Sequence, residues 1–374
     1  MLRRALYAVC AIAILAGLWG VYNRLVFGHE NTAYGSYVVW GLWVAMYIFF
    51  VGIAAGAFVF ATLDYLFKVP LFKGTGRIAL YLTLITLGAG LVQVWLDLGH
   101  MERIWKVYLE GNLYSVMAQI VWGYTLFGVL TLAALLLTFR SSAGWLLKLL
   151  MALGIPMALY LSGAIGALMG VQAARLFWHV GLLPAQFPFF SLASGAAALM
   201  AALGLFGDPK DERLPQQLWV LAMTSIALQG TKLYFLWADF SQSLYGNVPQ
   251  NVAAVNEVLF GQYWWAFWFL QIGLGAVIPI IILAWPGLAR RPQVAGWMGV
   301  CILIGFAVAR ANIVFPALTV PELESMTSAF HGARLQFTYF PSSVEWALAA
   351  GIVGAAVLAF VVGRDHLPLT LREP

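Results

Sequence analysis

Charged residues are scarce in this chain, and no stretch of it is polar enough to form a soluble domain. They make up 9% of the 374 residues, hydrophobic residues make up 63%, and the mean hydropathy is +0.88. Soluble globular domains carry roughly 25% charged residues, so this composition excludes that class. The longest connections between hydrophobic stretches, about 240–259 and 316–341, are too short to hold a separate soluble catalytic domain.

Cysteine and histidine are also rare. Cys10 and Cys301 both fall inside hydrophobic stretches, so they form no disulfide framework. They are too few for an iron–sulfur cluster, which takes about four ligands, and a haem b group would need axial histidines in the middle of spanning helices. The histidines lie instead at the boundaries of hydrophobic stretches or in the C-terminal tail, namely His29, His100, His179, His331 and His366. We therefore expect no haem, iron–sulfur cluster or other metal site in this chain.

Long hydrophobic runs, by contrast, fill the chain. A helix that crosses a bilayer needs roughly 20 apolar residues, and runs of that length follow one another with short connections. They lack the alternating polarity of barrel strands. Since backbone groups in lipid must be bonded internally, the predicted fold is an all-α polytopic membrane protein, a single integral membrane domain over residues 1–374. Its ten predicted spans are 5–27, 37–66, 77–98, 114–139, 145–170, 187–206, 216–239, 260–285, 294–315 and 342–363.

The first span resembles a secretion signal only at its start. Arg3 and Arg4 precede the apolar run, but the run continues to about Val26 without a small-residue cleavage site. This pattern predicts a retained first helix.

Basic residues predict the orientation. Ten crossings return the C-terminus to the side of the N-terminus, and the positive-inside rule then places both termini in the cytoplasm and the chain in the cytoplasmic (inner) membrane. The net charge of +5 follows from this topology, and no basic stripe indicates nucleic-acid binding. Thirteen of the twenty basic residues share the cytoplasmic side, namely Arg3, Arg4, Lys68, Lys73, Arg77, Arg140, Lys148, Lys210, Arg213, Arg290, Arg291, Arg364 and Arg372.

Two similar halves are suggested by a pair of acidic residues. Asp97 and Asp239 occupy the same relative place in the spans 77–98 and 216–239. Residues 37–170 and 187–315 are therefore interpreted as two parallel four-helix repeats, with the first and last spans flanking them.

Polar side chains that can carry chemistry gather at the predicted outer ends of the spans. Gln93, Asp97 and His100 are spaced i, i+4 and i+7, which predicts one shared helical face. A carboxylate beside an imidazole suits proton-coupled quinol chemistry, because one group accepts a hydroxyl proton while the other bonds the opposite oxygen. A solvated helix end is the alternative, but a carboxylate at this depth is costly without a function. Asp97 and His100 are therefore the predicted catalytic residues.

Other outer helix ends would supply the walls of a quinone pocket. Tyrosine and tryptophan also form belts at membrane interfaces in general, so each aromatic residue alone is weak evidence. Their convergence on one rim with Asp97 favours a binding site. The predicted quinone-binding residues are Tyr37, Trp40, Gln93, Arg103, Tyr114, Gln119, Arg175 and His179.

A second polar set occurs in the later half. Lys232 and Asp239 are seven residues apart and share a helical face, with Lys232 roughly 10 Å below the predicted helix end at 1.5 Å per residue. An unpaired ammonium there would be costly, so either a structural ion pair or a proton path explains it. The predicted proton path consists of Asp64, Gln229, Lys232, Asp239 and Glu345.

At these residues the chain resembles a known family. Residues 97–105 are similar to the D-L-G-x-P-x-R-x-W signature of the NrfD/PsrC family of quinone-interacting membrane subunits, with Met101 in place of proline. Residues 41–57 resemble the family's second helix, and residues 178–192 its connection between spans 5 and 6. The stretch 310–346 resembles the ten-span branch, found in complexes associated with sulfite reduction and in hydrogenases of the hydrogenase-2 type.

The resemblance implies a subunit without cofactors of its own in a respiratory oxidoreductase complex. It would bind menaquinone or ubiquinone near the outer face and exchange electrons with an extracytoplasmic, ferredoxin-like iron–sulfur subunit. The family's motif positions carried over to this chain are Asp97, Gly99, Arg103, Arg310, Tyr339 and Glu345.

Two other functions remain open from the sequence. A proton- or ion-coupled transporter would use Asp97, Lys232 and Asp239 as gating charges, but it would be expected to contain short, broken helices. A purely structural membrane anchor would have no need for charges within the membrane.

Overall fold

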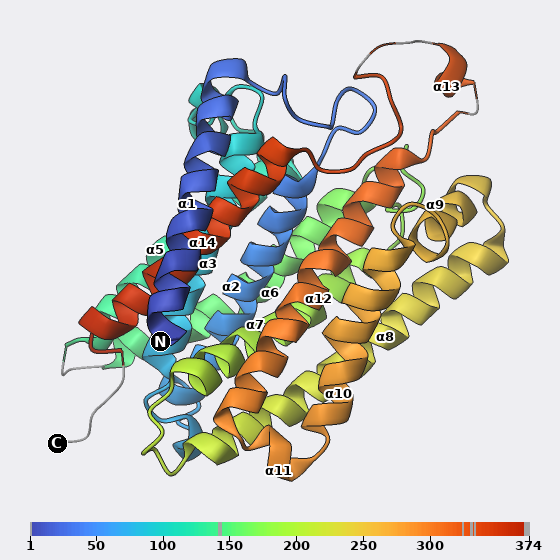
Figure 1. Cartoon of the computed structure of the whole chain (residues 1–374). Coiled ribbons are helices and arrows are strands. Elements are labelled where there is room, and N and C mark those ends of the chain that lie inside the picture. The colour runs from blue at the N-terminus through green and yellow to red at the C-terminus, as the bar shows by residue number, and fades with distance from the viewer. Residues whose placement is uncertain (1, 141–143, 324, 330–331, 333, 370–374) are drawn as a thin grey trace.

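The computed structural model describes residues 2–140, 144–323, 325–329, 332 and 334–369. These residues form a bundle of helices without strands, as Figure 1 shows. The long helices are α1 (Leu2–Phe27), α2 (Leu42–Tyr65), α3 (Gly76–Asp97), α5 (Val116–Thr138), α6 (Trp145–Gly170), α7 (Leu182–Phe206), α8 (Leu214–Gly246), the π-helical η3 (Ala266–Val277) continued by α10 (Ile278–Leu283), α12 (Pro292–Thr319) and α14 (Ser343–His366). Short helices lie in the connections: η1 (Pro70–Phe72), η2 (Met101–Arg103), α4 (Lys106–Leu109), α9 (Pro249–Leu259), α11 (Pro286–Ala289) and α13 (Met326–Ala329).

The predicted all-α polytopic membrane fold is confirmed. Within the described residues, nine helices are long and apolar enough to cross a membrane. The remaining predicted span, 216–239, corresponds to α8, which at 33 residues is the longest of the described helices but carries more polar side chains than the others.

Several boundaries differ from those of the predicted spans, and three of these differences bear on the site. The span predicted from residue 37 begins at Leu42, because Gly41 is extended (φ −114°, ψ −153°) and residues 28–41 form a loop. The helix predicted from residue 187 begins at Leu182. The helix predicted to end at residue 239 continues to Gly246 and stops at Asn247, whose left-handed backbone (φ 51°) is a common helix terminator.

The two ends of the bundle differ. The start of α1 and the end of α14 lie at one end, called here the terminal end (Figure 1). The loop 28–41, the connection 320–342 and the helices α9 and α13 lie at the opposite end, called the loop end. Which end faces the cytoplasm stays a prediction.

The helices pack as two groups joined in the middle. In the first group α2 packs against α3 and α6, while α5 packs against α3 and α6. In the second group α7 packs against α8 and α12, and η3 and α10 complete the ring. Helix α2 packs against α7 and α12, which joins the groups. Helix α14, which pairs with α1, packs against α3. That residues 37–170 and 187–315 are two parallel four-helix repeats stays a prediction.

Glycines make the closest crossings possible. A Cβ atom on Gly56 of α2 would overlap the carbonyl oxygen of Ser191 in α7, and one on Gly195 would overlap the backbone of Gly56. Gly17 of α1 and Gly351 of α14 meet in the same way. Since lipid gives no hydrophobic drive for helix association, such backbone contact is a main source of packing energy.

The α2–α7 crossing predicts a matched pair of variants. Gly56→Ala should lower the thermal unfolding temperature in detergent and the monodisperse fraction, because its methyl group forces the helices apart. Gly88→Ala, where nothing lies within 4 Å of the added atom, should leave both unchanged or slightly improved, since alanine favours a helix over glycine by roughly 1 kcal/mol. Equal effects of the two variants would contradict the packing role of Gly56.

Candidate functional site

Asp97 is the last residue of α3, and its carboxylate accepts a hydrogen bond from the loop 28–41. The Tyr34 hydroxyl donates to Oδ1 of Asp97 at 2.8 Å, and Tyr34 is 6% exposed. Arg24 of α1 is also buried and donates from Nε to the Leu96 carbonyl at 2.6 Å and from Nη2 to the Leu98 carbonyl at 2.5 Å. A cation that bonds the last carbonyls stabilises the C-terminus of a helix. The end of α3 and its carboxylate are thus held from two sides.

Glu345 is fully buried at the start of α14 and accepts from several donors. Its Oε1 receives the Tyr339 hydroxyl at 2.5 Å and the Leu42 amide at 3.4 Å. Its Oε2 receives the amides of Ala33 at 2.9 Å and Ser342 at 3.0 Å, the latter as part of a capping box. One carboxylate therefore ties together the loop 28–41, the start of α2 and the start of α14.

Aromatic rings enclose the two carboxylates. The ring of Tyr34 lies 6.1 Å from that of Trp43 and 5.5 Å from that of His29, centroid to centroid. A Cβ atom on Gly41 would lie 2.5 Å from Oε1 of Glu345, from the Tyr339 hydroxyl and from the Tyr34 ring, so only glycine fits there. We call Tyr34, Asp97, Tyr339 and Glu345 the loop-end network.

The hydroxyl of Tyr34 stays protonated in this setting. Burial, followed by the neighbouring Asp97 carboxylate, raises the pKa of Tyr34 well above its ordinary value. Burial, followed by the positive charge of Arg24, lowers the pKa of His29. At neutral pH the network thus offers a phenol donor, with a neutral imidazole nearby.

His100 does not lie beside Asp97, and the predicted shared face of Gln93, Asp97 and His100 is wrong for His100. Helix α3 ends at Asp97, and Leu98 is extended (φ −61°, ψ 133°). His100 is therefore not part of the helix and does not share its face. Its side chain is 64% exposed, and its Nδ1 lies 3.0 Å from Oε1 of Glu102. The position next to Asp97 is taken by Tyr34, which spacing along the chain could not identify because it comes from a distant loop.

Three of the predicted pocket-wall residues meet at the loop end. Tyr37 stacks on Phe337 at 4.6 Å, and its hydroxyl has no partner among the described residues. Trp40 stacks on Trp178 at 5.4 Å. Arg175 donates from Nη2 to the Tyr37 carbonyl at 3.1 Å. These contacts join the loop 28–41 to the connection between α6 and α7.

Gln93 is fully buried one turn below Asp97. Neither its amide nitrogen nor its amide oxygen has a partner in the described part of the chain. Arg175, described above, also forms an ion pair with Glu322, in which Nε of Arg175 lies 2.9 Å from Oε1 of Glu322.

The other four predicted wall residues lie apart. Arg103 is exposed beside Glu102, with 3.5 Å from its Nε to Oε1. Tyr114 is 92% exposed. Gln119 bonds the Leu113 carbonyl and the Tyr160 hydroxyl, and His179 bonds the Gly170 carbonyl. The structure therefore does not bring them together with Asp97.

Two of the predicted proton-path residues have structural partners elsewhere. Oδ2 of Asp64 receives the amides of Gly74 at 2.8 Å and Gly76 at 2.9 Å, which fixes the start of α3 at the terminal end. Glu345 belongs to the loop-end network. The other three, Gln229, Lys232 and Asp239, lie together on the buried face of α8.

Lys232 forms no ion pair with Asp239. It is 1% exposed, and its Nζ has no hydrogen-bond partner in the described residues. The Phe306 ring lies beside it, 4.6 Å from Nζ to the centroid. Gln229 donates to the Gly275 carbonyl at 2.6 Å, while its Oε1 stays unpartnered among the described residues. The structural ion pair that the sequence left open is thus not formed.

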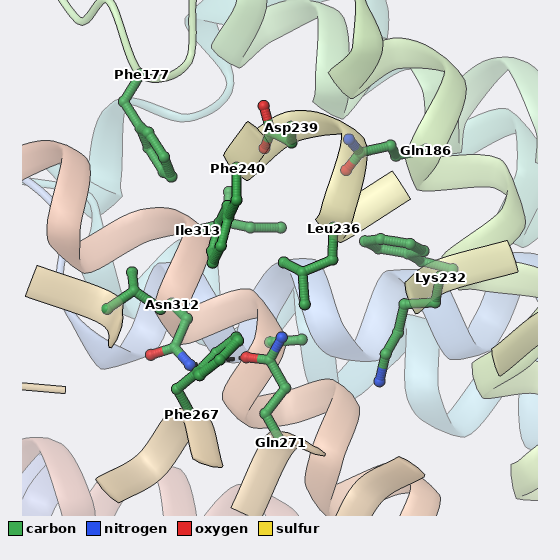
Figure 2. A pocket seen from close by; sticks show the side chains of 13 residues that line it. Phe177, Gln186, Lys232, Leu236, Asp239, Phe240, Phe267, Gln271, Asn312 and Ile313 are labelled. Carbon is green, nitrogen blue, oxygen red and sulfur yellow. Dashed lines mark hydrogen bonds between the residues drawn. The ribbon is translucent and has the colours of Figure 1, made fainter. Parts of the chain in front are cut away.

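A cavity lies beside these residues in the second group of helices. Figure 2 shows it between α8, η3, α12 and the connection before α7, with Lys232 and Asp239 among its lining side chains. Gln186, Gln271 and Asn312 also line it, and Asn312 donates to Gln271 at 2.7 Å. Sequence reasoning did not single out Gln186 or Gln271. The available signal was an amide inside an apolar span, which is costly unless it has a partner or a role.

Arg310 lies close to this cavity without a carboxylate partner among the described residues. Its guanidinium is 4.2 Å from the Phe187 ring and 5.2 Å from the Phe190 ring, and its Nη1 has no hydrogen-bond partner there. In the described part of the chain no three His, Cys, Asp or Glu side chains gather as a metal site. His331 lies outside the described residues.

Comparisons with known proteins agree on one family. Residues 30–322 match the family described as "Polysulphide reductase, NrfD". The chain is 29% identical to a selenate reductase subunit of Mesobacillus selenatarsenatis, over 100% of this chain and 96% of the relative. It is 27% identical to an Hdr-like menaquinol oxidoreductase integral membrane subunit of Archaeoglobus fulgidus, over 87% and 84%. It is 21% identical to the menaquinone reductase integral membrane subunit of Nitratidesulfovibrio vulgaris, over 96% and 89%.

The loop-end network predicts a strong effect of Glu345→Gln. The new amide group would face the N–H donors of Ala33 or Ser342 with its own N–H groups, and a lost hydrogen bond to a charged group costs about 1.5–3 kcal/mol. Thermal unfolding should shift downwards, and limited proteolysis should cut the loop 28–41 faster. Glu30→Gln, on an exposed side chain of the same loop, is the control. Wild-type protease resistance of Glu345→Gln would show that this carboxylate does not hold the loop.

Proposed function

Because this chain belongs to the NrfD family, we propose that it is a membrane subunit of an oxidoreductase complex that reacts with a quinone or quinol. The observation that carries the proposal is the half-buried Tyr34–Asp97 hydrogen bond at the loop end. The names of two relatives refer to menaquinol and menaquinone, which favours menaquinone over ubiquinone.

The side chains of the loop-end network carry the groups that quinone chemistry needs. A quinone supplies two-electron, two-proton chemistry when bound. Asp97 can accept a hydroxyl proton, and the Tyr34 hydroxyl, which donates to Asp97 in this structure, would turn to a carbonyl oxygen of the bound ring. Together they would supply the acid–base pairing that such chemistry needs. The unpartnered amide of Gln93, one turn deeper, offers a further donor. Trp43 and Trp40 provide aromatic surfaces that exclude water.

The finer assignments belong to the same proposal. The loop end would face the outside of the cytoplasmic membrane, with both termini in the cytoplasm, as the distribution of basic residues indicates. Electrons would pass between the quinone and an extracytoplasmic iron–sulfur subunit of the complex docked at that end. Asp97 would take part in the accompanying proton transfer.

Proton movement through the second group is a further part of the proposal. Ser225, Gln229, Lys232, Asp239 and Ser243 lie on one buried face of α8. That face extends over 18 residues, about 27 Å, which approaches the thickness of the hydrocarbon core. Ser225, Gln229 and Lys232 each carry an atom without a partner in the described residues, and such atoms are normally bonded to buried water. We propose that protons move along this face.

Asp97→Asn should reduce quinol-linked turnover by about 10²–10⁴-fold while leaving assembly of the complex intact. The amide keeps the shape of the side chain but cannot accept a proton, and general base catalysis is worth about this much. Turnover of the purified complex with a soluble quinol analogue is the measurement, with the exposed Glu102→Gln as control. Wild-type turnover in Asp97→Asn would remove Asp97 from the mechanism.

Lys232→Met should abolish any membrane potential that accompanies quinone turnover, because methionine cannot carry a proton along α8. The measurement uses a potential-sensitive dye with the complex reconstituted in vesicles. Lys210→Met, at an exposed lysine of the terminal end, should behave as wild type. If turnover generates no potential even in the wild type, a proton route through this chain does not exist.

A further inference from the structure

Arg310 and Lys232 are two cations buried in the second group of helices. Arg310 is 2% exposed and Lys232 is 1% exposed, and neither Nη1 of Arg310 nor Nζ of Lys232 has a hydrogen-bond partner among the described residues. Buried charges in proteins are ordinarily paired, and an ionisable residue within a membrane usually marks a functional position. Two such cations in one bundle are expected to act on each other.

Phenylalanine rings connect the two cations. The Arg310 guanidinium lies 5.2 Å from the centroid of the Phe190 ring. The Phe190 ring lies 6.0 Å from the Phe306 ring, and the Phe306 centroid lies 4.6 Å from Nζ of Lys232. Phe306 and Arg310 are four residues apart on α12, so their side chains are neighbours on one helical face. Lys232 therefore lies about one helical turn from Arg310 along α12, with aromatic rings beside both charges.

The positive charge of Arg310 acts on Lys232 across this short separation. Like charges repel more strongly in a protein interior than in water, because the dielectric constant is lower there. A guanidinium keeps its proton, so Arg310 is a fixed charge, whereas the Lys232 amine can gain or lose one. The Phe306 ring attracts an ammonium group, and Arg310 opposes it. Lys232 is thus held between two opposing influences.

The other helices packed against α8 bring few titratable groups. Helices α7, α10, α11 and η1 carry none. Helix α9 carries Glu257, which accepts from a backbone amide of the segment that follows it at the loop end. Helix α12 carries Cys301 in addition to Arg310. On α8 itself, Asp239 lies seven residues from Lys232 and forms no ion pair with it. Arg310 is therefore the cation that faces Lys232 within the described residues.

Arg310 also faces the first group of helices. A Cβ atom on Gly52 of α2 would lie 3.5 Å from Nη2 of Arg310 and 3.4 Å from Oγ of Ser191 in α7. The guanidinium thus lies where α2, α7 and α12 meet, at the junction of the two groups. A carboxylate introduced at position 191 would reach it.

From these contacts we propose that Arg310 is a positioning residue for proton transfer along α8: its fixed positive charge prevents Lys232 from holding a proton permanently. The only bond that forms and breaks is an N–H bond at Nζ of Lys232, which accepts a proton as a neutral amine and releases it from the ammonium form. Without Arg310, the ammonium form would persist beside the Phe306 ring and block the route. This inference rests on the proposed function, because it deepens the proton route proposed along α8.

The test measures membrane potential and quinol turnover together, with the intact complex in vesicles, as charge moved per electron over a range of pH. In Arg310→Gln the optimum of this ratio should move to higher pH by about one unit, the size expected for like charges at this range, because Lys232 then releases its proton only at a lower proton concentration. Arg310→Lys keeps the charge and should retain the wild-type optimum. Slower turnover with an unchanged optimum in Arg310→Gln would mean a merely structural role and overturn the inference.

A second pair of variants changes the same charge without removing Arg310. Ser191→Asp should pair with the guanidinium and move the optimum as Arg310→Gln does, whereas Ser191→Asn, of the same size but uncharged, should not. If Arg310→Gln fails to assemble, this pair decides: equal optima in the two Ser191 variants overturn the inference.

The wild-type complex separates failure of this inference from failure of the proposed function. Quinol turnover without a potential at any pH would overturn the proton route and leave the reaction with quinol standing. Absent quinol turnover in the wild type would overturn the proposed function itself.

Discussion

A buried polar atom in this protein needs a hydrogen-bond partner, because the lipid around the helices offers none. Glu345 and Lys232 show the two possible outcomes of that constraint. Glu345 accepts from Tyr339 and from backbone amides of three segments, so both of its side-chain oxygens have donors. Lys232 has the Phe306 ring beside it but no acceptor in the described residues. The first residue holds the architecture together, and the second marks a place where the architecture is incomplete without a ligand, a proton or water.

The same constraint separates two kinds of carboxylate that sequence reasoning treated alike. Asp64 is bonded by two amides at the start of α3 and so belongs to a helix terminus. Asp97 has a phenol as its partner and lies next to an amide unpaired among the described residues, an arrangement that can change its protonation without loss of the backbone fold. Which role a half-buried carboxylate has depends on whether its donors come from the backbone or from side chains.

Much of the fold could be predicted from the sequence, since hydrophobic length alone determines the spans. The predicted span 145–170 coincides with α6, and those of α1 and α3 agree within a few residues. The start of α2 was placed too early because residues 37–41 are apolar enough to continue the helix, yet Glu345 bonds the Leu42 amide and fixes the chain direction there. The candidate site was only partly predictable. Asp97 stood out as an acid in an apolar span, but its partner Tyr34 lies in a loop that helical periodicity cannot place. His100 was wrongly assigned to the face of Asp97 because the helical spacing was continued beyond Asp97, where α3 ends.

The pairing of α1 with α14 has a consequence for how the protein is made. Helix α1 finds its main packing surface, the Gly17–Gly351 crossing, only after α14 has been synthesised. Until then α1 remains largely surrounded by lipid or by the insertion machinery. Glu345 also lies on α14, so the loop 28–41 cannot settle over Asp97 before α14 has been made. Membrane proteins are built from the N-terminus onwards, and here the order of synthesis delays the site until α14 is present, so a prematurely terminated chain would leave the loop around Asp97 unsecured.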